Sequence, residues 1–350
     1  MTGTATAIPS VTGNAMSRPL VEIENLEVSF VTRDATVRAV NGLSLRIMPG
    51  EVLCLIGESG SGKSVTMRAL MRLLPKGKTR FGGRVRVGDR DILSLREREL
   101  KSVRGAEIAM VFLEPMTSLD PVYTVGDQIA ETVMRHEGCG KTQAMERALE
   151  LLKLVRVPLP EQRLRAYPHE LSGGLRQRIM IATALSCRPK LLLADEPTTA
   201  LDATVQIQVL ILLRKLQAEF GMSVIFVTHD LGVAAQIADK VAVMYAGQIV
   251  EYGAADDVLL RPSHPYTLGL LASTVHGQKR DKDIEGIGGS PPDLRALPPG
   301  CSFAPRCRYA RTACTAAMPP AATFDGVTVR CYHAREIREN ANAARATTVN

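Results

Sequence analysis

The sequence predicts an α/β fold in which a mostly parallel sheet, covered by helices, carries a phosphate-binding loop. Residues 57–64 match the full pattern G-x-x-x-x-G-K-S/T, between an apolar run at 52–56 and a helical pattern at 65–70. Two more short apolar runs, at 190–196 and 223–229, indicate strands buried on both faces, which is typical of a parallel sheet. Strands that alternate with helices around such a loop indicate a nucleotide-binding core.

The N-terminal part of the chain predicts a disordered start and then a small β-layer. Residues 1–18 are rich in Ala, Thr, Ser and Gly without hydrophobic periodicity, so we expect them to be disordered. Residues 21–26 alternate as a half-buried strand does, and residues 39–47 predict a second strand that ends before the turn Pro49-Gly50. The β-layer therefore precedes the phosphate-binding loop.

The fixed positions of the loop each have a role in holding a nucleoside triphosphate. Glycines let the backbone turn its N–H groups towards the phosphates, and the N-terminus of the following helix adds a favourable dipole. Lys63 is expected to reach the β- and γ-phosphates, and the Ser64 hydroxyl to ligate Mg²⁺. A chance glycine-rich turn would not require the flanking strand and helix. The residues predicted to bind the nucleotide in this segment are Gly57, Glu58, Ser59, Gly60, Ser61, Gly62, Lys63, Ser64 and Val65.

Residues from about 120 to 170 predict a mostly helical insertion. Apolar residues recur at the spacing of one helix face between 125 and 134, after Thr124 and Asp127, which resemble a capping box. A second helical pattern at 144–155 is stopped by two prolines shortly after it. We therefore expect at least two helices between the loop and the next strand.

Side chains at the ends of the two later strands are the candidate catalytic residues. Asp195 is placed to hold Mg²⁺, directly or through water, and Glu196 to orient or deprotonate an attacking water. His229, at the end of the next strand, is expected to hydrogen bond to the γ-phosphate or to that water. An Asp-Glu pair before a proline is also common in turns, and a lone histidine is more often structural. The phosphate-binding loop in the same chain favours the catalytic interpretation.

A second candidate phosphate site precedes a helix at residues 171–178. Ser172, Gly173 and Gly174 would expose backbone N–H groups and a hydroxyl to an anion at the start of that helix. The alternative is an ordinary Ser-Gly-Gly turn. One chain has no need of two γ-phosphate sites, unless the second serves the nucleotide bound by a neighbouring copy.

Together these motifs resemble the ATP-binding-cassette (ABC) family, over roughly residues 20–333. The resemblance implies an ABC-type ATPase core with a RecA-like parallel sheet, an antiparallel β-layer and a helical insertion, followed by a small cysteine-containing C-terminal appendage. It also implies a head-to-tail dimer, in which Ser172–Gly174 of one cassette close over the ATP held by the other's phosphate-binding loop. Ala200-Leu201-Asp202 resembles the loop that lines the seam of that dimer.

Three segments are similar to the ATPase subunits of oligopeptide and dipeptide importers, including nickel-importing relatives. They are GESGSGKS at 57–64, EPMTSLDP at 114–121 and HPYT at 264–267. The resemblance implies a peripheral subunit on the cytoplasmic face of the cell membrane, which hydrolyses ATP to power peptide import. Its implied partners are two membrane-spanning permease subunits, a second ATPase subunit of the same or a related sequence, and, indirectly, an extracytoplasmic peptide-binding protein.

Two positions depart from the family pattern. The family usually has a glutamine that touches Mg²⁺ or the attacking water where this chain has Leu113, and leucine can do neither. Our hypothesis is that the site built on Lys63 hydrolyses ATP slowly for this reason. Residues 31–40 also offer no aromatic side chain near Val37 and Arg38, where many cassettes stack the adenine.

The composition of the chain changes at about residue 261, after which prolines become frequent. We expect an ATPase domain at 20–260, a C-terminal extension of the peptide-importer type at 261–335, and a flexible tail at 336–350. Four of the seven cysteines lie in the extension with the spacing C-x5-C-x6-C-x16-C, and four thiolates suit zinc or an iron–sulfur cluster. The resemblance favours a 4Fe–4S cluster over zinc or unligated thiols. The candidate ligands are Cys301, Cys307, Cys314 and Cys331.

Composition excludes some functions and leaves two alternatives. No apolar run approaches the roughly 18–20 residues that span a bilayer, and Met1 to Pro19 do not resemble a secretion signal, so we expect a cytoplasmic protein. The net charge is +7, but Lys and Arg are scattered, so we expect no nucleic-acid partner. The alternatives are a soluble ABC ATPase that acts on nucleic acid or the ribosome, and a regulatory cassette that hydrolyses ATP weakly.

Overall fold

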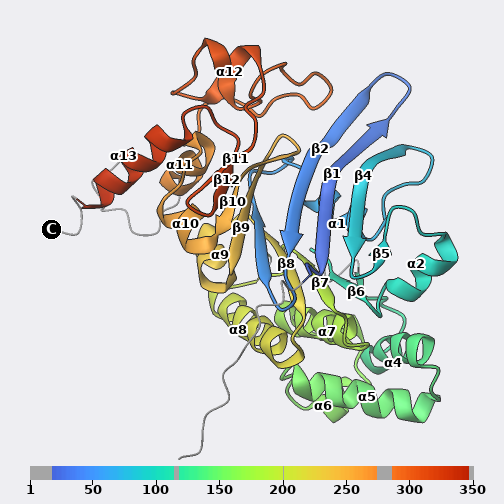
Figure 1. Cartoon of the computed structure of the whole chain (residues 1–350). Helices are drawn as coiled ribbons and strands as arrows, with labels where there is room; N and C mark the ends of the chain where they lie inside the picture. Colours follow the sequence, from blue (N-terminus) through green and yellow to red (C-terminus); the bar gives the residue numbers. More distant parts are fainter. Residues whose placement is uncertain (1–17, 114–117, 200, 274–285, 347–350) are drawn as a thin grey trace, which may run out of the picture.

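The computed structural model describes residues 18–113, 118–199, 201–273 and 286–346, with the side chains of 344–346 excepted. It consists of two sheets with helices packed on them (Figure 1). The disorder expected at residues 1–18 concerns a segment of which all but the last residue lies outside the described part. No helix among the described residues is both long and apolar enough to cross a bilayer.

Four strands near the N-terminus form an antiparallel sheet in the order β2-β1-β4-β5. The strands predicted at 21–26 and 39–47 are confirmed, but both are longer. A register shift between Ile23 and Leu26 interrupts the alternation of the first strand, with Asn25 at a φ of 50°, so the pattern did not predict that the strand continues. The strands are β1 (Val21–Val31), β2 (Thr36–Ile47), β4 (Thr79–Val87) and β5 (Arg90–Asp91).

The larger sheet has eight strands in the order β11-β12-β10-β9-β3-β8-β7-β6. The five strands from β9 to β6 pair in parallel, and the other three add antiparallel pairs at one edge. Every residue of β3, β7 and β8 is buried, as their continuous apolar runs predict. The strands are β3 (Val52–Ile56), β6 (Ile108–Val111), β7 (Leu191–Asp195), β8 (Ser223–Thr228), β9 (Lys240–Tyr245), β10 (Gln248–Ala254), β11 (Ala322–Phe324) and β12 (Val327–Val329).

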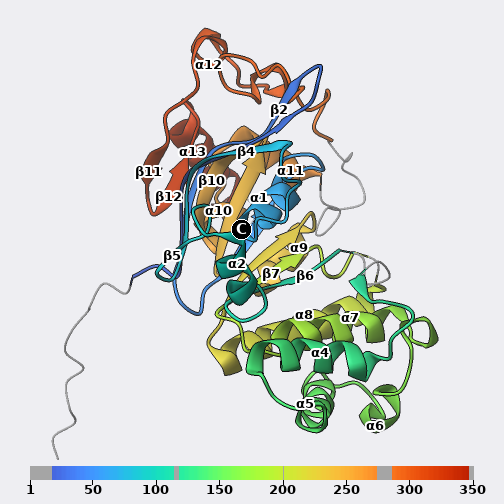
Figure 2. The same ribbon diagram turned by 90° about the vertical axis from the view of Figure 1, so that its right-hand side faces the viewer.

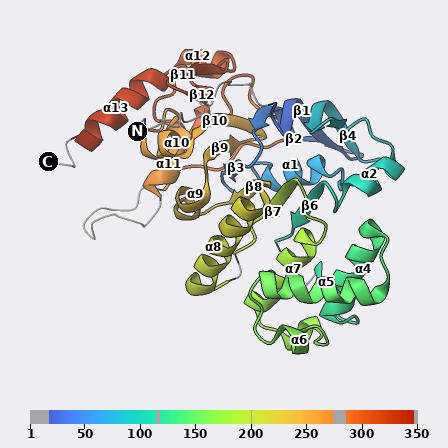
Figure 3. The same ribbon diagram turned by 60° about the horizontal axis from the view of Figure 1, so that its bottom comes forward.

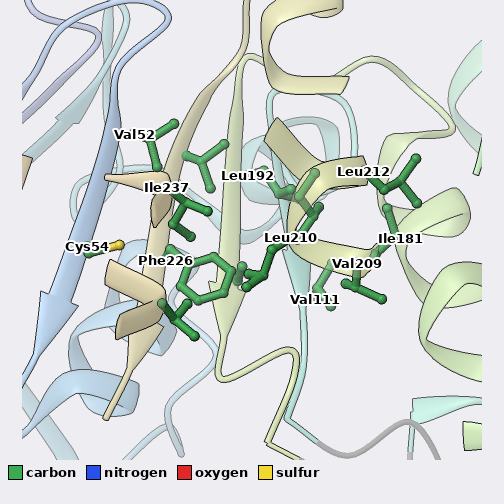
Figure 4. Packing of buried hydrophobic residues seen from close by; sticks show 14 of the residues in the cluster. Val52, Cys54, Val111, Ile181, Leu192, Val209, Leu210, Leu212, Phe226 and Ile237 are labelled. Carbon is green, nitrogen blue, oxygen red and sulfur yellow. The ribbon is translucent and has the colours of Figure 1, made fainter. Parts of the chain in front are cut away.

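Hydrophobic side chains pack against both faces of this sheet. Cys54 points to one face, where it joins Phe226 and residues of α7, α8 and α9 (Figure 4). Leu53 and Leu55 point to the other face, where they meet α1 and the antiparallel sheet. The central strands are therefore covered on both sides. The helices named here are α1 (Lys63–Leu70), α7 (Gly173–Leu185), α8 (Ala203–Phe220) and α9 (Leu231–Ile237).

The helical insertion lies at one end of the molecule, away from the C-terminal elements (Figures 2 and 3). Its first helix is capped as predicted, since the Thr124 hydroxyl accepts a hydrogen bond from the Asp127 N–H at 3.2 Å. The second helix buries Ala144, Ala148 and Leu151, which lie on the predicted face. The elements of this region and of the segment before it are α2 (Glu97–Val103), α4 (Val125–Glu137), α5 (Lys141–Leu154), α6 (Pro160–Arg163) and the 3-10 helix η1 (Pro168–Glu170).

The C-terminal extension joins the large sheet through one hairpin, so it is not separate from the core as the frequent prolines had indicated. The hairpin β11–β12 pairs with β10 at Glu251–Val329 and Tyr252–Thr328, because the edge of β10 offers unpaired backbone groups. The predicted flexible tail begins inside a helix, in which Ile337 and Arg338 are buried. The remaining elements are α10 (Ala255–Leu260), α11 (Pro265–Ala272), η2 (Ala304–Arg306), α12 (Thr312–Ala316) and α13 (Ala334–Ala346).

Candidate active site

The phosphate-binding loop connects β3 to α1, as the sequence pattern predicts. Gly57 and Gly62 have φ angles of 151° and 107°, in the region that favours glycine. A Cβ atom at Gly57 would lie 2.2 Å from the Met244 carbonyl oxygen, and one at Gly62 would lie 2.5 Å from the Ala39 carbonyl oxygen. Two reasons therefore require glycine at both positions. One is the positive φ angle, and the other is the close approach of β9 to Gly57 and of β2 to Gly62.

Lys63 is buried inside the loop that it belongs to. Its Nζ donates to the carbonyl oxygens of Gly57 at 2.7 Å and Glu58 at 2.9 Å. Burial lowers the pKa of Lys63, while the nearby carboxylates of Glu196, Asp195 and Glu58 act in the opposite direction. The ammonium group therefore lies close to the acids at the strand ends and is held by the backbone of the loop.

Ser64 and Asp195, the two predicted magnesium ligands, are hydrogen bonded although 131 positions separate them. The Ser64 hydroxyl donates to Asp195 Oδ1 at 2.9 Å. Burial raises the pKa of Asp195, and the hydrogen bond from Ser64 lowers it. A hydroxyl and a carboxylate side by side are the hard oxygen donors that Mg²⁺ prefers, so these residues fit that cation.

Glu196 and His229 also meet, because β7 and β8 are neighbours in the sheet. His229 Nδ1 lies 3.1 Å from Glu196 Oε2, and the Thr199 hydroxyl donates to the same oxygen at 3.0 Å. The backbone of Glu196 is at a φ of 47°, and its N–H donates to the Val227 carbonyl oxygen. Thr199 was missed by the sequence analysis, although a hydroxyl three residues after an acid is a visible signal.

Ser172–Gly174 lie at the start of α7, in the layer of α4 and α5. Ser172 is the N-cap residue, but its side chain makes no capping hydrogen bond, and the first turn carries no acidic residue. A Cβ atom at Gly174 would lie 2.7 Å from Val205 Cγ1 of α8, whereas one at Gly173 would meet nothing closer than Leu201 Cδ2 at 3.8 Å. Gly174 therefore packs on α8 and Gly173 keeps an open face. Among the described residues, no hydrogen bond joins this segment to the phosphate-binding loop.

The remaining predicted residues of the loop differ in exposure. Ser59 and Gly60 are exposed, and Val65 packs on the core behind the loop. The Ser61 hydroxyl is buried, and the described residues supply no hydrogen-bond partner for it. Buried hydroxyls are normally paired, so this one is available to a bound phosphate or a water molecule.

The loop predicted at the dimer seam and the segment after Leu113 are only partly within the described residues. Ala200 and residues 114–117 lie outside them. Asp202 is the N-cap residue of α8, where its carboxylate accepts from the Val205 N–H at 3.0 Å. Leu113 follows β6 and is 41% exposed, so it contacts solvent rather than the core.

The four cysteines of the extension line one small cavity, together with His264 and His333. Cys314 Sγ lies 3.8 Å from His333 Nε2. Burial raises the pKa of the Cys301 and Cys307 thiols, and raises that of Cys331 to about 12. The described residues contain no group of three or more His, Cys, Asp or Glu side chains placed to hold a metal ion, so this geometry does not support the predicted iron–sulfur cluster.

Comparison with known proteins identifies two matching families. The ABC transporter family matches residues 40–199, and the C-terminal region of oligopeptide/dipeptide transporters matches residues 250–314. The oligopeptide transport ATP-binding protein OppD of Salmonella typhimurium is 49% identical over 313 residues, which cover 89% of this chain and 93% of OppD. The dipeptide transport ATP-binding protein DppD of Bacillus subtilis is 46% identical over 315 residues, which cover 89% of this chain and 94% of DppD.

A solved structure has the same cassette fold. It is the dimeric ATP-binding cassette MJ0796 in a post-hydrolysis state bound to ADP and Pi, with a TM-score of 0.60 and 29% identity. The match covers 67% of this chain and 98% of that cassette. The fold predicted for the core is thereby confirmed.

Proposed function

Because this chain belongs to the ABC transporter family, as a relative of its oligopeptide and dipeptide transport ATP-binding proteins, we propose that it hydrolyses ATP to power the import of oligopeptides or dipeptides. The observation that carries the proposal is the convergence of Lys63, the Ser64–Asp195 pair and the Glu196–His229 pair. These residues lie at or after the carboxyl ends of the neighbouring strands β3, β8 and β7. This arrangement has the parts that phosphoryl transfer from a nucleotide to water requires.

The hydrolytic step follows from these contacts. The backbone N–H groups of the loop and Lys63 bind the β- and γ-phosphates of ATP. Ser64 and Asp195 would hold Mg²⁺, which when bound neutralises charge on the phosphate oxygens. Glu196 takes a proton from a water molecule whose oxygen bonds to the γ-phosphorus. The bond from that phosphorus to the β–γ bridging oxygen breaks, its electron pair stays on the bridging oxygen, and ADP and inorganic phosphate leave. His229 orients Glu196 and the phosphate.

Each active site is completed by a second cassette. Ser172–Gly174 present an open helix N-terminus that, among the described residues, makes no hydrogen bond to the chain's own phosphate-binding loop, and an unneutralised helix N-terminus favours an anion. The cassette MJ0796, whose fold is similar, is dimeric. The partners are a second ATPase subunit, identical or related, and two permease subunits at the cytoplasmic face of the membrane, with an extracytoplasmic peptide-binding protein acting indirectly and no nucleic acid.

Purification from native membranes under mild detergent tests this function. We expect membrane-spanning subunits and a second cassette to copurify, and MgATP hydrolysis by the complex to rise when the peptide-binding protein and peptide are added. Copurification with ribosomes or nucleic acid instead would support a soluble ABC ATPase. A complete complex that binds MgATP with negligible turnover would support a regulatory cassette.

Leu113→Gln is expected to raise ATP turnover in the assembled transporter. Loss of one preorganised polar contact in an active site costs on the order of 3 kcal/mol, roughly a hundredfold in rate, and glutamine can restore such a contact. Steady-state ATPase measurements on the complex check this. Leu159→Gln is the matched control, because Leu159 is also an exposed leucine but lies on the helical insertion. An unchanged or lower rate for Leu113→Gln would contradict the hypothesis that its site is slow.

We propose a 4Fe–4S cluster at the cysteine-lined cavity, with zinc as the alternative. Support comes from the gathering of all four cysteines of the extension around one cavity and from the resemblance to peptide importers. The thiolates would have to draw closer than they are here. Protein purified without oxygen is expected to absorb near about 400 nm and to contain about four iron atoms per chain. One zinc per chain would favour the alternative. If the protein contains neither iron nor zinc, the four cysteines are unligated thiols.

A further inference from the structure

Glu58, inside the phosphate-binding loop, is held by residues that follow it by more than 200 positions. Arg306 donates two hydrogen bonds to its carboxylate, from Nη1 to Oε2 at 2.6 Å and from Nη2 to Oε1 at 3.0 Å. The Tyr266 hydroxyl accepts from the Glu58 N–H at 2.7 Å. Lys63 Nζ donates a hydrogen bond to the Glu58 carbonyl oxygen at 2.9 Å. The side chain and both backbone groups of this residue are therefore engaged, two of the three by the C-terminal extension.

Arg306 is itself built into its position. Its side chain is only 4% exposed, and it also donates to the carbonyl oxygens of Gly288 at 2.8 Å and Ile287 at 3.1 Å, and to the Tyr245 hydroxyl at 3.3 Å. The paired carboxylate of Glu58 is the main reason why the pKa of Arg306 is raised. A guanidinium fork bonded at both ends has little freedom, so it fixes the carboxylate as well.

The Tyr266 ring is equally fixed. It is fully buried and packs against the rings of Tyr245 and Phe303, at centroid distances of 4.6 Å and 5.4 Å, and those two rings also contact each other. Its hydroxyl is thus presented to the loop by a packed aromatic cluster that joins β9, α11 and the extension. Arg306 lies over the same cluster, 5.9 Å from the Tyr245 centroid and 6.0 Å from that of Phe303.

We propose that Arg306 and Tyr266 are positioning residues for MgATP binding: the C-terminal extension sets the conformation of the phosphate-binding loop through Glu58. The proposal rests on the ATPase function proposed above. The loop binds phosphate through backbone N–H groups, and such groups are effective only within a few tenths of an ångström of their productive positions. Two anchors on the second residue of the loop restrict that movement.

Binding and turnover measurements on the full chain test this proposal. Arg306→Gln is expected to raise the dissociation constant for MgATP roughly tenfold and to raise KM similarly, with kcat at saturation within about threefold, because the loop binds ground state and transition state alike. Arg306→Lys keeps the charge but not the fork, so we expect an intermediate rise. Tyr266→Phe removes one hydroxyl and keeps the ring, and is expected to raise the dissociation constant about threefold to tenfold.

Arg295→Gln is the matched control, because Arg295 is an exposed arginine of the same extension that pairs with Asp293. We expect its MgATP affinity to equal that of the unchanged chain. The double variant Arg306→Gln/Glu58→Gln is expected to bind MgATP no more weakly than whichever single variant has the lower affinity. The reason is that both substitutions remove the same interaction, the Arg306–Glu58 pair. Additive losses would contradict the coupling.

Other outcomes are distinguishable from a failure of the ATPase function. If the unchanged chain binds and hydrolyses MgATP while Arg306→Gln and Tyr266→Phe bind it equally well, the positioning role is wrong and the ATPase function stands. If the unchanged chain does not bind MgATP, the ATPase function itself is wrong. Where Arg306→Gln fails to fold by circular dichroism, Tyr266→Phe and Arg306→Lys give the answer.

Discussion

Glu196→Gln is expected to lower ATP turnover by about a thousandfold, with MgATP affinity within a few-fold of the unchanged chain. Glutamine has nearly the same size and can still accept from Thr199 and face His229, but it cannot take a proton from water. The loss should therefore appear in kcat and leave binding intact. Steady-state ATPase rates and equilibrium binding of a fluorescent ATP analogue, both on the assembled transporter, measure the two quantities separately.

Glu219→Gln is the control for this result, because Glu219 is exposed on α8 and lies outside the site. It makes the same chemical change and is expected to leave turnover unchanged. A Glu196→Gln complex that keeps more than about a tenth of the original rate would show that another group activates the water.

Lys63→Met is expected to raise the dissociation constant for MgATP by about a hundredfold. Methionine fills similar volume but lacks the charge that meets the phosphates, and it leaves the Gly57 and Glu58 carbonyl oxygens without their donor. Hydrogen bonds to charged groups contribute about 1.5–3 kcal/mol, and 2.7 kcal/mol corresponds to about a hundredfold in affinity. Equilibrium titration with MgATP measures the change.

Lys215→Met provides the comparison, because Lys215 is exposed on α8. Its affinity for MgATP should match that of the unchanged chain. If Lys63→Met bound MgATP with unchanged affinity, Lys63 would not hold the phosphates in the proposed way. This conclusion would not depend on the ATP turnover of the variant.

The parts of the site that come from contiguous residues could be predicted from the sequence. The φ angles of Gly57 and Gly62 are a local requirement of the loop at 57–64, and its flanking strand and helix follow from hydrophobic patterns, whereas the close approach of Met244 and Ala39 to these glycines does not. Asp195, Glu196 and His229 could be assigned to strand ends in the same way. Their pairing with Ser64 and with each other depends on the strand order, which the linear sequence does not display.

The C-terminal part of the chain was predicted less well, because its structure depends on contacts between residues that are distant in the sequence. Frequent prolines after residue 261 indicated a separate appendage, but the edge of β10 accepts the hairpin β11–β12 as further strands. A flexible tail was expected at 336–350, yet the described residues from 334 to 346 form the alanine-rich helix α13, in which Ile337 and Arg338 are buried. Cysteine spacing likewise does not fix how closely the sulfur atoms approach, so the cluster at these four cysteines stays a proposal.

The sequence by itself determined the chemistry of this protein, because phosphate binding depends on short-range requirements: glycines at strained φ angles, a lysine and a hydroxyl at a helix start, and acids after buried strands. Only the tertiary structure decided that Arg306, 248 positions after Glu58, reaches into the phosphate-binding loop. Such a contact arises from the packing of the extension against β9 and the large sheet. No periodicity or motif encodes the distance between residues so far apart in the chain.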